Sequence, residues 1–139
     1  MFTSMSSSGM YKDELMGIEV TLMDSAEFPF PVSRHTIFNI TIRCKDREQL
    51  LELSHYRFYL MSGSNIHNSI DINQDAELHK YIYGSGNFSL FFGNTVAGWC
   101  ESQYITILFP RMDEIHYKPS SIIFYYEPYE RLIQIPLTY

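Results

Sequence analysis

Short runs of alternating apolar and polar residues recur along the chain, and this period of two predicts β-strands with one buried face. The clearest run is 36–44, in which Phe38, Ile40 and Ile42 share one face with Cys44 while polar residues alternate between them. Other short apolar runs that predict strands lie at 18–22, 56–61, 88–92, 105–109, 122–126 and 132–137. The pattern therefore predicts about seven short strands.

Turn signals separate these strands. SGSN at 62–65 and GSGN at 84–87 are rich in glycine, serine and asparagine, which favour tight turns. The last two runs are separated only by EPYE at 127–130, so they predict a β-hairpin. Pro136 lies in the second arm, and because proline cannot donate to a central ladder, we predict that this arm lies at a sheet edge.

Helical patterning is weak throughout the chain. The closely spaced leucines of 45–54 could support one short helical turn, and the polar segment 66–83 predicts one short strand and a long loop. Many short strands bounded by turns are typical of an all-β fold. We therefore predict a two-sheet immunoglobulin-like β-sandwich of about seven strands with one short helical turn.

The predicted sandwich occupies 17–139, because 1–16 is serine-rich and lacks a clear period, as expected of a flexible leader. A chain of 139 residues is long enough for one domain with a buried core. The leader lacks the basic and apolar regions of a secretory signal, and no apolar run reaches the roughly 18 residues that a transmembrane helix needs.

Composition narrows the classes of partner. The chain has 10 Lys and Arg against 16 Asp and Glu, a formal net charge of -6, and 16% aromatic residues. Nucleic-acid binding requires clustered basic residues that neutralise phosphates, so we expect no nucleic-acid partner. The many tyrosines and phenylalanines are residues that favour sheets.

The order of several motifs resembles a known family. The motifs are NITI at 39–42, LELS at 51–54, YRFYL at 56–60, LFFGNTVAGW at 90–99, ITILFP at 105–110 and the terminal hairpin over 122–137. In this order they resemble the telokin-like, immunoglobulin-type sandwich domains, a family of unknown function common in surface lipoproteins of Gram-positive bacteria. The strongest marks of the resemblance are Gly93, Gly98 and Trp99, and an extra stretch at 100–104 separates them from the next strand.

The resemblance implies a binding or scaffold module and supplies no catalytic residues. Two locations stay open: the cell envelope if an upstream signal was removed, and the cytoplasm otherwise. The runner-up interpretation is a small acidic cytosolic inhibitor or immunity-type protein that masks a partner protein, since a net charge of -6 would suit a basic target.

Candidate catalytic and metal-binding residues favour ordinary structural roles. Cys100 lies beside Glu101, and because a carboxylate raises the pKa of a thiol, we interpret Cys100 as a passive thiol. Cys44 and Cys100 could form a disulfide or remain two buried thiols. The histidines are too widely spaced in the sequence to form a recognisable metal-binding motif, so we predict no metal site. We also predict no cofactor and no catalytic residue. The five histidines are His35, His55, His67, His79 and His116.

One short motif resembles the start of a calcium loop. Asp71, Asn73 and Asp75 have the spacing of the first three ligands, but Ala76 replaces the glycine of the turn and Ile82 replaces the bidentate glutamate. We therefore interpret the motif as a polar turn and expect no calcium binding.

Tyrosines are the best candidates for contact with a partner protein. Tyrosine combines an apolar ring with a polar hydroxyl and is enriched at protein interfaces. Several tyrosines lie at alternating or polar positions, where at least some must point away from the core. The predicted partner-binding residues are Tyr81, Tyr83, Tyr125, Tyr126 and Tyr129.

Overall fold

The computed structural model describes residues 7–14, 16–44, 50–51, 58–84, 98–99, 102–111, 118–126 and 130–138. The strands are, in chain order, β1 (Ser8–Lys12), β2 (Met16–Leu22), β3 (Thr36–Cys44), β4 (Leu50–Leu51), β5 (Phe58–Ser62), β6 (Asn65–Asn68), β7 (Gly98–Trp99), β8 (Ser102–Phe109), β9 (Pro119–Tyr126) and β10 (Arg131–Pro136). The helix α1 spans Ala76–Gly84, and short 3₁₀ helices lie at Ser25–Glu27, Val32–Arg34 and Ile72–Gln74.

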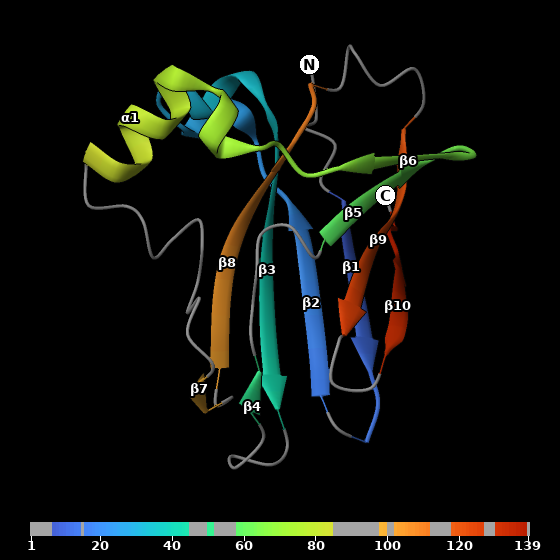
Figure 1. Cartoon of the computed structure of the whole chain (residues 1–139). Helices are drawn as coiled ribbons and strands as arrows, with labels where there is room; N and C mark the ends of the chain where they lie inside the picture. Colours follow the sequence, from blue (N-terminus) through green and yellow to red (C-terminus); the bar gives the residue numbers. More distant parts are fainter. Residues whose placement is uncertain are drawn as a thin grey trace.

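Two four-stranded antiparallel sheets form the body of the protein (Figure 1). The first sheet has the order β1-β2-β3-β8 and the second has the order β10-β9-β5-β6, while β4 and β7 form a separate short pair. This arrangement confirms the predicted all-β sandwich. The hairpin of β9 and β10 is also confirmed, and β10 lies at the end of the second sheet's order, as Pro136 predicted.

The main core lies between the inner faces of the two sheets. Alternate residues of each strand point inward, which is why the period of two in the sequence identified most of the core. Phe58 and Phe124 face each other across β5 and β9 with stacked rings whose centroids are 4.7 Å apart. Phe38 and Phe109 form an edge-to-face pair at 5.9 Å on the first sheet. All four rings are fully buried.

The two sheets join along β1 and β10. The backbones of Ser8 and Thr138 exchange hydrogen bonds of 3.2 and 2.8 Å, and the Cα of Gly9 approaches the backbone of Pro136 so closely that a Cβ there would collide with its carbonyl oxygen. The predicted leader over 1–16 therefore needs correction, because β1 is a paired strand of the first sheet. Its short alternation, interrupted by glycine and charged residues, was too weak to identify from the sequence.

A polar cluster centred on Asp13 fastens the turn between β1 and β2 to β10. The Tyr11 hydroxyl donates to Asp13 Oδ2 at 2.7 Å, the Met16 amide donates to Asp13 Oδ1 at 2.9 Å, and Arg131 Nη1 lies 3.6 Å from Asp13 Oδ2. The hydrogen bond to the Asp13 carboxylate, together with partial burial, raises the pKa of Tyr11. The cluster thus connects one sheet to the other at the end of the sandwich.

A second, smaller core lies where α1 covers the outer face of the first sheet at one end (Figure 1). It contains Ile37 of β3, Leu108 of β8 and the α1 residues Leu78 and Ile82, all fully buried. The prediction of a long loop over 66–83 was therefore wrong in part: β6 is the expected short strand, but α1 replaces the end of the loop. The helix forms because two apolar residues four positions apart can bury against the sheet.

The predicted helical turn at 45–54 also differs from the structure. Leu50 and Leu51 form β4, which pairs in register with Trp99 and Gly98 of β7. Two adjacent leucines are compatible with either a helix or a strand, and pairing with β7, which lies far along the sequence, decides between them. The rest of that segment lies outside the described residues.

His35 makes the stability depend on pH. Its Nδ1 lies 3.1 Å from the carbonyl oxygen of Pro31 and 3.3 Å from that of Val32, and burial lowers the pKa of His35 below its ordinary 6.5. Nearby Asp75 opposes this shift and Arg34 adds to it. Because the folded state binds the proton less readily than the unfolded chain, this contribution to stability is complete above pH 6.5 and is lost as the pH falls through the lower folded pKa.

We therefore expect the free energy of unfolding to fall on acidification from neutral pH, and the fall to be smaller in His35→Asn. Asparagine retains an N–H donor near the position of Nδ1 but does not titrate. Denaturant titrations at neutral pH and at a pH below 6.5 measure both quantities. Equal losses in the two proteins would show that His35 does not cause the acid sensitivity.

Candidate functional site

The predicted partner-binding tyrosines lie on two separate parts of the molecule. Tyr125 lies on β9 of the second sheet, whereas Tyr81 and Tyr83 lie on α1. Tyr126 ends β9, but its side chain lies outside the described residues, as does all of Tyr129. The five tyrosines therefore do not form one continuous site among the described residues.

The two tyrosines of α1 lie on different flanks of the helix. Tyr81 lines an open groove of about 480 Å³ together with Phe30 and Lys80, while the ring of Tyr83 stacks on His79 with centroids 4.2 Å apart. Phe30 is 60% exposed, and the guanidinium of Arg34 covers its ring at 4.9 Å. Both tyrosines also make further interactions within the protein.

Tyr125 belongs to a larger surface, the outward face of the second sheet. Because side chains alternate along a strand, the residues between the core positions of β10, β9, β5 and β6 point away from the core. These residues are Leu132, Gln134, Pro136, Ser121, Ile123, Tyr125, Tyr59, Met61, Ile66 and Asn68. None of them is charged, and we call this surface the uncharged face.

The uncharged face exposes an aliphatic side chain on each of its two edge strands, β10 and β6. Leu132, directly opposite Tyr125 on the neighbouring strand, is 66% exposed, and Ile66, opposite Met61, is 58% exposed. Gln134 of β10 donates from Nε2 to the hydroxyl of Ser121 on β9 at 3.0 Å and so links these two strands on the uncharged face. The exposed leucine and isoleucine are thus held on a regular sheet rather than on loops.

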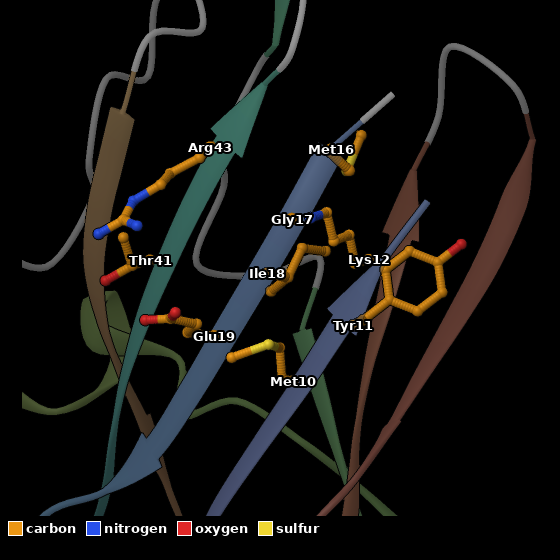
Figure 2. A pocket seen from close by; sticks show the side chains of 9 residues that line it. All are labelled: Met10, Tyr11, Lys12, Met16, Gly17, Ile18, Glu19, Thr41 and Arg43. Atoms are coloured by element: carbon orange, nitrogen blue, oxygen red, sulfur yellow. The ribbon is translucent and has the colours of Figure 1, made fainter. Parts of the chain in front are cut away.

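The outer face of the first sheet is different in character. Its outward residues include Lys12, Glu19 and Arg43, and polar pairs such as Thr106 with Asn39, whose Oγ1 and Oδ1 are 3.1 Å apart. A hollow of about 320 Å³ lies on this face. In Figure 2, Met10, Glu19, Thr41 and Arg43 extend from three neighbouring strands to one side of the sheet, while Tyr11 points to the other.

The calcium-like motif has a structural role. Asp71 caps the Ile72–Gln74 helix by accepting from the Asn73 amide at 3.1 Å, and Asp75 caps α1 by accepting from the Leu78 amide at 3.1 Å. The other oxygen of Asp75 lies 3.4 Å from Arg34 Nη2. Within the described ranges, no group of three or more His, Cys, Asp or Glu side chains is placed to hold a metal ion.

The marks of the suspected family are only partly described. Gly98 and Trp99 form β7, whereas Gly93 and Cys100 lie outside the described residues. The extra stretch at 100–104 has a structural explanation in its second half. Residues 102–104 begin β8 and pair with Arg43, Ile42 and Thr41, so they lengthen β8 to match β3.

Sequence reasoning missed Leu132, Met61 and Ile66 as candidate contact residues. The sequence did contain a signal for this face of the sheet. The run at 122–126 is apolar at every position, so both faces of that strand are suited to burial, one in the core and the other against a partner. No helix in the described part of the chain is long and apolar enough to cross a membrane.

The described residues thus offer two surfaces of contrasting chemistry on opposite sheets. The uncharged face carries exposed aliphatic side chains and half-buried tyrosines. The hollow on the first sheet carries both positive and negative side chains. Comparisons with family models, with curated proteins and with solved structures find no match to this chain.

Proposed function

We propose that the chain is a non-catalytic protein-binding module of the immunoglobulin-like sandwich type, and that the uncharged face contacts its partner. The observation that carries the proposal is the composition of this face. Charged residues make up 19% of the chain, yet none occurs among the described residues of the uncharged face. Depletion of charge with enrichment of tyrosine and methionine is the compositional signal of interface cores.

The geometry of the face also suits protein binding. Four antiparallel strands hold the exposed side chains in fixed rows, so little conformational entropy is lost when a partner covers them. Tyr59 and Tyr125 are half-buried against their neighbours and would serve as rigid anchors, while Leu132 and Ile66 present the most exposed apolar area.

The telokin-like, surface-lipoprotein assignment stays part of the same proposal, supported by the order of the sequence motifs. The alternative, an acidic inhibitor that masks a basic protein, is less well supported by this surface. Such an inhibitor would need carboxylates at its contact surface. The uncharged face has none.

Site-specific photo-crosslinking in the native cell tests the proposal. A photoreactive phenylalanine analogue at position 132 should form an adduct with a distinct protein, whereas the same analogue at position 21, on the outer face of the first sheet, should not. Excess purified wild-type protein should suppress the adduct at position 132. Ile66→Asp should compete at least about tenfold less well, because a charge would then be buried without a partner.

Thr21→Asp is the matched control, since it adds the same charge to the opposite sheet, and it should compete as well as the wild type. Melting temperatures of both variants establish that each is folded. Equal adduct formation at positions 21 and 132, or full competition by Ile66→Asp, would contradict the assignment of the uncharged face.

A further inference from the structure

The hollow on the first sheet is built around a missing side chain. Lys12, Gly17 and Arg43 lie side by side in register across β1, β2 and β3, all on the outer face. A Cβ on Gly17 would meet only the carbonyl oxygen of Tyr11, at 3.9 Å, so the space above this glycine is open. Because adjacent strands are about 4.8 Å apart, the two cationic residues flank bare backbone at a separation of about 10 Å.

The next outward row supplies a negative group and an apolar wall. Met10, Glu19 and Thr41 are in register on the same three strands, and Met10 is 66% exposed. Glu19 lies two residues from Gly17 along β2, which corresponds to about 6.8 Å. Figure 2 shows the Glu19 carboxylate between Met10 and Thr41, on the same side of the sheet as Arg43.

These charges are near one another but do not neutralise one another. The ion pairs found among the described residues join Arg34 to Asp75 and Glu77, and Arg131 to Asp13. Lys12, Glu19 and Arg43 take part in none of them. Both signs of charge are therefore available to a third group placed over Gly17 and Glu19.

We propose that this hollow binds a small zwitterion of dipeptide size, with its carboxylate over Gly17 between Lys12 and Arg43 and its ammonium group at Glu19. A guanidinium and an ammonium are the preferred partners of a carboxylate, and the Arg43 guanidinium can bind it through two parallel N–H donors. The ammonium group of the ligand pairs with the Glu19 carboxylate.

The dimensions select the class of ligand. In an extended dipeptide the ammonium nitrogen and the carboxylate are separated by about two residue rises, the same distance as Gly17 from Glu19. A volume of about 320 Å³ lies at the small end of ligand pockets and leaves room for one apolar side chain against Met10. A phosphate ester fits the hollow less well than a zwitterion, because the Glu19 carboxylate would repel its doubly charged phosphate group.

Titration of the whole protein with L-alanyl-L-leucine, followed by amide chemical shifts, tests the proposal. The amides of Gly17, Glu19 and Thr41 should shift in a saturable manner, with a dissociation constant on the order of 1 mM for a ligand of this size. The N-acetylated dipeptide and the C-terminal amide should each bind at least about tenfold more weakly, because each removes one charged contact.

Variants identify the groups involved. Arg43→Gln and Lys12→Gln should weaken the free dipeptide about tenfold, and Glu19→Gln should weaken the free dipeptide but not its N-acetylated form. Gly17→Val should abolish binding by filling the open space, and Gly17→Ala should weaken it. Lys80→Gln on α1, which removes a cation elsewhere, should bind as the wild type does.

Several results would overturn the proposal. The first is that the amides around Gly17 do not shift at a dipeptide concentration of about 10 mM, ten times the expected dissociation constant. The second is equal binding of the blocked and free peptides. The third is unchanged binding by a folded Gly17→Val protein. The hollow lies on the sheet opposite the uncharged face, so failure here leaves the protein-binding proposal standing. Failure of the photo-crosslinking experiment would equally leave this one standing.

Discussion

Phe124→Ala is expected to lower the free energy of unfolding by about 3–5 kcal/mol, the usual cost of removing a buried aromatic ring. Phe124 is fully buried, lies directly opposite Phe58 in the ladder and stacks on its ring at 4.7 Å with an interplanar angle of 12°. The substitution removes this contact and leaves a cavity between the sheets. In a chain of this size the melting temperature should fall by roughly 10 °C or more.

Ile123→Ala is the matched control, because the neighbouring residue points to the other side of the same strand. Ile123 is half-buried on the uncharged face, so its truncation should cost roughly 1 kcal/mol. Denaturant titration of both variants measures the difference. Similar losses in the two proteins would mean that β9 does not have one face in the core and the other outside it.

The contrast between Phe124 and Ile123 also shows what the sequence can predict. The strand at 36–44 and the terminal hairpin were predicted because one face of each strand packs in the main core. In 122–126 every residue is apolar, so the sequence identifies the strand but not which residues face inward. Which residues face inward depends on the register of β9 with β5 and β10, and that register is set by residues distant in the sequence.

The helix α1 illustrates a different limit. Its local signals were present, since Asp75 caps its first turn and Leu78 and Ile82 are four residues apart. With only two fully buried residues, however, the helix depends on Ile37 and Leu108, which point outward from the first sheet. The sequence does not indicate that an apolar residue on the outer face of a sheet is covered by a helix.

The candidate binding surfaces could be predicted least. The tyrosine content suggested five contact residues, but the fold does not bring Tyr81 and Tyr83 together with Tyr125. The hollow at Gly17 requires three residues from three strands to lie in one row. Neither their spacing in the sequence nor their composition reveals that arrangement.

Gly9→Ala is expected to lower the free energy of unfolding by about 1–3 kcal/mol, the range for forcing extra atoms into a packed site. The added Cβ would collide with the carbonyl oxygen of Pro136 and lie 3.0 Å from Cγ2 of Ile135. The main obstacle is a backbone atom rather than a flexible side chain, so relief requires β1 and β10 to separate. That would weaken the hydrogen bonds between Ser8 and Thr138.

Gly17→Ala, in the same sheet, should not lower the free energy of unfolding as Gly9→Ala does. Its new Cβ meets only the Tyr11 carbonyl oxygen at an ordinary 3.9 Å, and alanine restricts the unfolded chain more than glycine does. The free energy of unfolding should therefore be unchanged or rise by up to about 1 kcal/mol. Denaturant titration of the two variants measures both signs. If Gly9→Ala were as stable as Gly17→Ala, the two sheets could not meet as closely as they do at β1 and β10, and the sandwich would have to be open on that side.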